Sequence, residues 1–146
     1  MLTIRTKLLR ESASLPTYGS GAAAGADLRA CLDAPVTIAP GQTVLIPTGV
    51  AMEIPLGYAG LVYARSGLSV KRDLAPANKV GVIDADYRGE IFVPLHNHGK
   101  EPQTVEHGER IAQMIITACP ASEFVQSDEL SDTARGEGGF GSTGNK

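Results

Sequence analysis

The apolar residues of this chain come in short runs separated by turns rich in glycine and proline, and this spacing limits the folds open to it. Seven runs follow the pattern: 4–9, 36–38, 43–46, 50–54, 61–63, 91–95 and 111–118. In several of them every second residue is apolar, as with Val50, Met52 and Ile54, and this period of two is typical of strands. Strands spaced about ten residues apart predict an all-β sandwich, jelly roll or barrel.

Helical periodicity is almost absent. With 17 glycines and nine prolines among 146 residues, long helices are not expected. One short helix is predicted over residues 66–72, with Ser66 as its N-cap. If the run 111–118 alternates regularly, Gln113 lies on the same side as Ile111, which is unusual for a strand that only packs a core.

Composition is typical of an ordered domain with few charges. Hydrophobic residues make up 42%, charged residues 20%, and the formal net charge is −3. Such a chain has no general affinity for nucleic acid or anionic membranes, so we expect neither as a partner. The first residues lack a signal-peptide pattern, and no run approaches the roughly 18 apolar residues of a membrane span. Cys31 and Cys119 lie beside apolar runs, which favours two reduced, buried thiols and a soluble, cytoplasmic protein.

The end of the chain differs from the rest because glycine dominates residues 135–144. The sequence therefore predicts a domain over residues 1–124 followed by a flexible arm over residues 125–146. A frayed end is the plainer alternative. However, the arm also carries Arg135 and Phe140, which a mobile lid would use for charge and for stacking on a ligand.

The segment 81–90 carries the densest set of chemically useful side chains. Asp84, Asp86 and Tyr87 lie in an expected turn between apolar runs that end at position 83 and start at position 91. A carboxylate at a strand end beside a pocket is a candidate general base that activates water. The alternative is an ordinary turn in which Arg88 and Glu90 form a solvated pair, and the segment alone leaves both open.

Two further segments could hold ligands. Residues 65–67 begin the predicted helix, where free N–H groups and an arginine favour phosphate, although a simple serine cap is the plainer alternative. Three histidines, His96, His98 and His107, include a His-x-His pair. No cysteine or third spaced ligand accompanies that pair, so we expect surface or strand-edge histidines rather than a metal site.

Five segments, in this order, resemble the five motifs of trimeric dUTP pyrophosphatases (dUTPases). They are 24–30 (AGADLRA), 64–68 (ARSGL), 81–90 (GVIDADYRGE), 108–114 (GERIAQM) and 135–144 (RGEGGFGSTG). The resemblance implies an all-β, distorted jelly-roll or β-clip barrel with one short helix, assembled as a homotrimer with active sites between subunits. It also implies Mg2+-dependent hydrolysis of dUTP to dUMP and pyrophosphate, which lowers dUTP and supplies dUMP for thymidylate synthesis.

The resemblance implies roles for the residues around the base and the sugar. Asp84 matches the carboxylate that orients and deprotonates the water attacking the α-phosphorus. Tyr87 matches the ring that packs on deoxyribose and excludes a 2′-hydroxyl, and Asn78 matches the side chain that pairs with uracil. Four residues are expected to complete the base pocket: Gly81, Val82, Ile83 and Phe92.

It implies further roles at the phosphates and the metal. Four residues match phosphate contacts: Arg65, Ser66, Gly67 and Gln113. Asp27 matches the acid that holds a water on Mg2+. In the arm, Arg135 and Phe140 match residues that close over phosphate and uracil, and Gly141 and Ser142 match further phosphate contacts.

The sequence departs from the family pattern at two positions near the predicted helix. Ala64 stands where proline is common, and Asp73 stands where glycine is expected after the helix. Because aspartate tolerates the left-handed conformation less well than glycine, a difference is expected at the helix exit.

The sequence leaves two rival functions open. A dCTP deaminase has the same fold but lacks the glycine-rich arm with arginine and phenylalanine, so the arm counts against it. A non-catalytic nucleotide-binding β module is the rival of a different class, and in it Asp84 and Arg135 would be dispensable.

Overall fold

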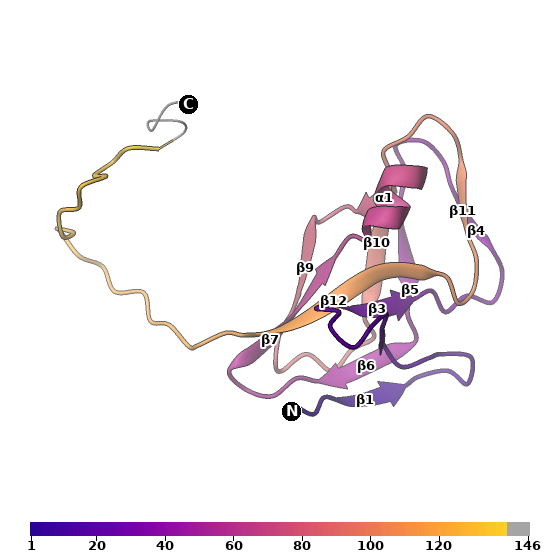
Figure 1. Ribbon diagram of the computed structural model, residues 1–146, viewed down its shortest axis with the longest axis horizontal. Helices are drawn as coiled ribbons and strands as arrows, with labels where there is room; N and C mark the ends of the chain where they lie inside the picture. The colour runs from indigo at the N-terminus through magenta and orange to yellow at the C-terminus, as the bar shows by residue number, and fades with distance from the viewer. Residues whose placement is uncertain (140–146) are drawn as a thin grey trace.

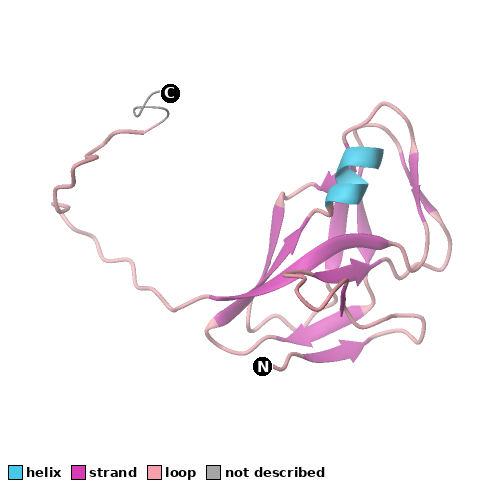
Figure 2. Ribbon diagram, in the orientation of Figure 1, coloured by secondary structure: helices cyan, strands magenta, loops and turns pink. Residues whose placement is uncertain are grey.

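Every apolar run identified in the sequence forms a strand. The structure is a computed structural model that describes residues 1–139. These residues form twelve strands and one helix, arranged as a body with an extended C-terminal segment (Figures 1 and 2). The predicted all-β class with one short helix is confirmed.

The largest sheet is antiparallel and contains residues of the first, third and fourth motifs. Its five strands, in spatial order, are β2 (Thr17–Tyr18), β3 (Ala26–Arg29), β12 (Arg110–Ala118), β7 (Tyr58–Tyr63) and β9 (Val80–Ile83). One row of cross-strand partners runs through Asp27, Gln113, Tyr63 and Val80. Residues from four distant segments therefore lie side by side.

Three smaller antiparallel sheets complete the body. Their strands are β5 (Thr43–Pro47), β10 (Phe92–Asn97) and β8 (Leu74–Pro76) in the first, β1 (Arg5–Leu8) and β6 (Val50–Glu53) in the second, and β4 (Val36–Ile38) and β11 (Gln103–Val105) in the third. Most paired strands are distant in sequence, so the chain crosses repeatedly between sheets.

The four sheets enclose one hydrophobic core. Its fully buried side chains include Leu28, Ile38, Ile46, Leu95 and Ile111. They come from the five-stranded sheet, the three-stranded sheet and the β4–β11 pair. The core uses aliphatic side chains because the chain has no tryptophan and only seven other aromatic residues. Burial of these branched residues supplies the main driving force for closing the sheets on each other.

The helix lies in its predicted range but is capped differently. α1 spans Ser66–Arg72, with Arg65 as the N-cap and no side-chain hydrogen bond at that cap. The prediction of Ser66 as the cap is wrong, because the extended backbone of Arg65 makes Ser66 the first helical residue. Ser69 Oγ instead donates to the Arg65 carbonyl, at 3.1 Å. No helix in residues 1–139 is long and apolar enough to cross a membrane.

Asp73 ends α1 in the left-handed conformation, with φ at 52°. Its carbonyl accepts a hydrogen bond from the His98 amide, at 2.8 Å. The helix exit therefore follows the backbone path that glycine would favour, and the expected difference at this exit is not found.

Strand β12 contains a β-bulge near its start. Its register with β3 shifts by one residue between Arg110 and Ala112. Ile111 and Ala112 are both completely buried, whereas Gln113 is half-buried. The expectation that Gln113 shares a side with Ile111 is wrong, because the extra residue breaks the regular alternation.

Other differences from expectation concern short strands and one cysteine. Five strands of two to four residues, β2, β3, β8, β9 and β11, lie outside the seven apolar runs named above. Cys31 is buried as expected, but Cys119 is exposed because it follows the end of β12. Both thiols are free.

After β12 the chain leaves the body and runs outward (Figure 1). Residues 119–139 contain no strand or helix, and nearly all of them are exposed. Phe124 is 99% exposed and Val125 77%. This segment therefore adds nothing to the core described above.

Candidate active site

The turn after β9 places Asp84 at the edge of the body. Asp84 is exposed and follows Ile83 directly, and its carbonyl accepts from the Tyr87 amide, at 3.2 Å. This hydrogen bond closes a tight turn, so the carboxylate sits at the end of a paired strand. The position of the turn is thus fixed by the paired strand that precedes it.

Tyr87 is held across the same turn. Its hydroxyl donates to the Glu90 carbonyl, at 2.9 Å. A Cβ added at Gly89 would lie only 2.6 Å from Tyr87 Cζ, so glycine is needed where the ring crosses the backbone. The phenol is therefore fixed by one hydrogen bond and one close contact.

Beside this turn lies a hollow of about 220 Å³. Its lining residues are Val82, Ile83, Asp84, Tyr87, Glu90, Ile91 and Phe92. The structure thus brings together five of the residues assigned to the base, the sugar and catalysis. Two other assigned residues lie close by, Gly81 in β9 and Asn78 just before that strand. A Cβ at Gly81 would be 3.2 Å from Asn78 Nδ2, so glycine lets the amide approach the strand.

Glu90 and Arg88 do not pair with each other. Glu90 Oε1 accepts from the Gly49 amide at 2.8 Å, and Arg10 lies 3.7 Å from its other oxygen. Arg88 Nη1 donates to the backbone carbonyls of Ala85 and Tyr87. The alternative of a solvated Arg88–Glu90 pair is wrong, since Glu90 anchors the hairpin to the neighbouring β5–β6 turn.

A second cluster forms around Asp27 in the largest sheet. Asp27 is 8% exposed, and its two oxygens accept from different arginines: Oδ1 from Arg65 Nε at 2.7 Å and Oδ2 from Arg110 Nη1 at 3.2 Å. Sequence reasoning gave Arg110 no role, although it lies within the fourth motif. Its contact with Asp27 depends on the bulge, which the sequence does not reveal.

Gln113 lies next to this cluster. Its Nε2 donates to the Ala64 carbonyl, at 2.9 Å, and a Cβ at Gly25 would lie 2.7 Å from its Oε1. Gln113 is thereby tied to the segment that leads into α1. The exposed Ser66 and Gly67 follow directly at the start of that helix.

The two clusters lie at opposite ends of the paired strands β7 and β9. Ile83 pairs with Gly60, whereas Arg65 follows Tyr63 at the other end of β7. The five residue steps from Gly60 to Arg65 span about 17 Å at the rise of an extended strand. One chain therefore does not bring Asp84 within contact distance of Arg65.

Asp27 is the carboxylate of the second cluster that could serve Mg2+, an ion that prefers oxygen ligands. Residues 1–139 contain no group of three or more His, Cys, Asp or Glu side chains that could hold a metal ion. Asp27 is a single buried carboxylate beside the arginines, and Mg2+ is commonly held by one or two carboxylates together with substrate phosphates and waters. The residues thus fit a Mg2+ that arrives with a triphosphate.

The contacts of the histidines are with residues outside both clusters. His96 Nδ1 is 2.8 Å from Thr43 Oγ1, and its ring contacts that of His98. Partial burial lowers the pKa of His98, and the nearby His96 and Lys79 lower it further, while Asp73 opposes the shift. His107 Nδ1 accepts from the Leu32 amide.

Part of the expected arm lies outside the described residues. Arg135 is described, and its Nε donates to the Gly138 carbonyl, at 2.7 Å. Phe140, Gly141 and Ser142 lie beyond residue 139. Their assigned roles stay predictions.

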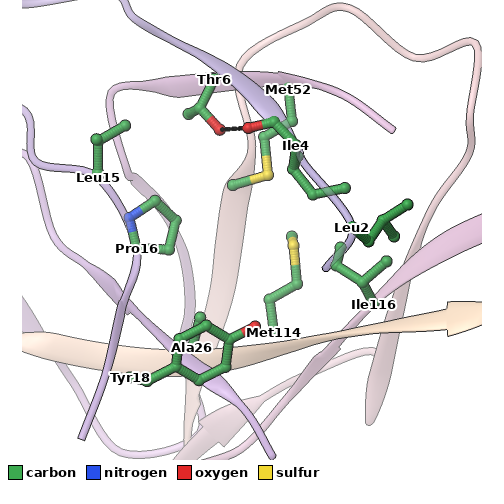
Figure 3. Close-up of a pocket in the computed structure, with 10 residues that line it drawn as sticks. All are labelled: Leu2, Ile4, Thr6, Leu15, Pro16, Tyr18, Ala26, Met52, Met114 and Ile116. Carbon is green, nitrogen blue, oxygen red and sulfur yellow. Dashed lines mark hydrogen bonds between the residues drawn. The ribbon is translucent and has the colours of Figure 1, made fainter. Parts of the chain in front are cut away.

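A further hollow with a mostly apolar lining shares no residue with either cluster (Figure 3). It measures about 330 Å³ and is lined by residues such as Leu2, Ile4, Tyr18, Met52 and Met114. Within residues 1–139, no Asp, Glu, Lys or His lines this hollow. It offers no general base and is not a candidate for catalysis.

Comparison with known proteins agrees with the motifs. A family model for dUTPase matches residues 11–144. A deoxyuridine 5′-triphosphate nucleotidohydrolase from Desulfitobacterium hafniense is 56% identical over 131 residues, which are 89% of this chain and 87% of that protein. A mutant dUTPase of Staphylococcus bacteriophage 80alpha, solved with dUpNHpp, has a TM-score of 0.86 and 32% identity over 99% of both chains.

A further mutant dUTPase, from phage phi11 of S. aureus, is described with a structural Mg(II) ion. It has a TM-score of 0.81 and 26% identity, and the alignment covers 88% of this chain and 99% of that chain. These relatives are, by name, enzymes that hydrolyse a nucleoside triphosphate. The chain belongs to the dUTPase family, and the expected jelly-roll β fold is confirmed by the likeness to the solved dUTPases.

Proposed function

We propose that this protein hydrolyses dUTP to dUMP and pyrophosphate with Mg2+. The observation that carries the proposal is Asp84, a carboxylate at the rim of a hollow formed by a strand backbone, Tyr87 and Phe92. The relatives named as deoxyuridine triphosphate nucleotidohydrolases support the choice of substrate.

Asp84 is the general base. Its carboxylate orients a water and takes a proton from it as the water attacks the α-phosphorus. Exposure at the strand end leaves the carboxylate free to meet a water and a phosphate from another part of the assembly. Proton abstraction of this kind contributes about 10²–10⁴-fold, so the remaining acceleration comes from positioning and from charge.

The hairpin selects the base. Asn78 and the backbone of Gly81, Val82 and Ile83 offer amide donors and acceptors to the edge of uracil, with Phe92 as a wall. Cytosine presents a donor where uracil has an acceptor, so it leaves polar groups of the site unpaired. The close fit of Asn78 against Gly81 supports this role.

Tyr87 selects the sugar. Its ring, held by Glu90 and Gly89, packs on deoxyribose and leaves no room for a 2′-hydroxyl. A fixed ring is required because a soft pocket rejects an added hydroxyl by only about 10²-fold.

The phosphates are bound by residues of the second cluster. Arg65 supplies charge, and three others supply polar contacts: Ser66, Gly67 and Gln113. Mg2+, when bound, neutralises charge on the phosphates, and Asp27 holds one of its waters. Positive groups at this place are needed because the whole chain has a net charge of −3.

The active site lies between subunits of a homotrimer. The separation of about 17 Å along β7 between the Asp84 end and Arg65 in one chain supports this arrangement, because both must contact one triphosphate. A neighbouring copy that brings its Arg65 end to the Asp84 hairpin would complete the site.

The C-terminal arm closes the site. The proposed division into a domain over residues 1–124 and an arm over 125–146 rests on the exposure of residues 119–139. In the arm, Arg135 pairs with phosphate, Phe140 stacks on uracil, and Gly141 and Ser142 contact phosphate. A cytoplasmic location is part of the same proposal.

One incubation tests the activity and separates it from its rivals. The protein is incubated with Mg2+ and either dUTP or dCTP, and both pyrophosphate and ammonia are measured. We expect pyrophosphate from dUTP and no ammonia from dCTP. Ammonia from dCTP would identify a deaminase. If neither pyrophosphate nor ammonia forms, a binding module would remain.

A further inference from the structure

The β-bulge of β12 brings Arg110 to the phosphate end of the proposed site. In a regular strand, residues three apart point to opposite faces. The bulge places Ile111 and Ala112 together in the core, so Arg110 and Gln113 both stay outside it. Arg110 thereby reaches Asp27, the cross-strand partner of Gln113.

Asp27 joins Arg110 to Arg65. Each carboxylate oxygen of Asp27 accepts from one of the two guanidinium groups, and Arg65 Nη1 also lies 3.4 Å from the Arg110 carbonyl. Arg65 is thus held at its Nε and Nη1, and its Nη2 has no hydrogen-bond partner among residues 1–139. A guanidinium held at two of its three nitrogens presents the third to a ligand.

The net charge of the cluster also favours phosphate binding. Asp27 alone with Arg65 would form a neutral pair, and a neutral pair attracts phosphate weakly. Arg110 adds a second positive group against the single carboxylate, so the cluster keeps one surplus positive charge. Because Asp27 is 8% exposed, this arrangement is partly shielded from solvent.

From these observations we propose that Arg110 is a positioning residue for triphosphate binding. Through Asp27 it fixes the guanidinium of Arg65 and supplies the charge that Asp27 would otherwise cancel. The proposal rests on the proposed function, because it takes Arg65 as a phosphate contact. Each Asp27 oxygen has a second acceptor site, so a water on Mg2+ can still bind there.

The experiment compares Arg110→Gln and Arg110→Lys with a matched control. Arg29→Gln is the control, since Arg29 is the cross-strand neighbour of Arg110 and its Nη1 donates to the Gly108 carbonyl at 2.8 Å. Affinity is measured by calorimetry in EDTA for dUpNHpp and, by NMR titration, for deoxyuridine, which has no phosphate. Thermal unfolding is followed for each variant.

For Arg110→Gln we expect dUpNHpp binding to weaken by about tenfold, as the loss of one charged hydrogen bond predicts. Deoxyuridine affinity stays unchanged, and the KM for dUTP rises more than kcat falls. Arg110→Lys keeps the charge and recovers part of the loss. Arg29→Gln binds both ligands as the unmodified protein does.

Unchanged dUpNHpp affinity in both Arg110 variants would overturn the inference, as would an equal loss for dUpNHpp and deoxyuridine. If Arg110→Gln does not fold, the Lys variant decides, with a smaller phosphate-specific loss expected. The proposed function fails separately, if the unmodified protein neither binds dUpNHpp nor hydrolyses dUTP.

Discussion

At the scale of single residues, the candidate site depends on side chains that the backbone holds in place. Tyr87 lies across Gly89 and donates to Glu90, while Glu90 accepts from the Gly49 amide. Each contact removes freedom from the next residue along the turn. Asp84 therefore sits on a hairpin whose shape is set before a ligand arrives.

Asp84→Asn should abolish turnover and retain binding. The amide keeps the shape of the carboxylate but loses the basic oxygen, so kcat should fall by at least about 10²-fold while the Kd for dUpNHpp changes little. Asp86→Asn, in the same exposed turn, is the matched control and should stay near full activity. A smaller loss for Asp84→Asn would remove it from the role of base.

Tyr87→Ala should narrow the preference for dUTP over UTP, measured as the ratio of kcat/KM values. Removing the ring opens the space that a 2′-hydroxyl needs, and a soft pocket then discriminates by only about 10²-fold or less. Gly89→Ala should act in the same direction because its Cβ overlaps the ring. If both variants keep the original ratio, Tyr87 does not set sugar selectivity.

At the scale of elements, long and regular features were predictable and irregular ones were not. α1 falls on its predicted range, and the strands of the longer apolar runs lie where expected. Strands β2 and β11 were not predicted, because they are too short and too polar to show an alternation of apolar residues. The hollow at Asp84 was predictable because its lining residues lie close together in the sequence, within residues 82–92.

The Arg110–Asp27 contact was not predictable from the sequence. It needs the bulge in β12, and a bulge shows only in the register between β12 and β3. The helix cap failed for a similar reason: Arg65 and Ser66 are one residue apart, and only the backbone angles decide which of them is helical.

The exit of α1 provides a stability test. Asp73 has a φ of 52°, where a β-branched residue is strongly disfavoured. Asp73→Val should lower the free energy of unfolding by about 1–2 kcal/mol. For Asp73→Gly the relief of strain is offset by the larger entropy of unfolded glycine, so the change should stay below about 1 kcal/mol.

Denaturant unfolding at one fixed protein concentration measures these differences, since assembly makes stability depend on concentration. Equal midpoints for the Val and Gly variants would mean that the left-handed conformation of Asp73 does not cost what its backbone angles imply.

At the scale of the whole molecule, the body and the arm should be separable. Residues 119–139 are almost entirely exposed and outside the core. A chain ending at Ala134 should therefore sediment as a trimer and melt close to the full-length protein. Its dUTP turnover should fall by about two orders of magnitude or more, since lid closure and phosphate charge are lost. Near-full activity, or failure to fold, would contradict the lid assignment.

The central claim is that Asp84 of one chain and Arg65 of another act on the same dUTP, and mixing of inactive variants tests it most directly. Asp84→Asn and Arg65→Ala chains are unfolded together, refolded at equal concentration, and confirmed as trimers by sedimentation. A control mixture pairs Asp84→Asn with Asn78→Ala, because both residues lie on one hairpin and are supplied by one chain.

If the site is shared, random assembly gives about a quarter of the sites one unmodified hairpin and one unmodified Arg65. We predict that the first mixture regains about a quarter of full dUTP hydrolysis and that the control mixture regains none. A first mixture that stays as inactive as its two separate variants would contradict the shared site.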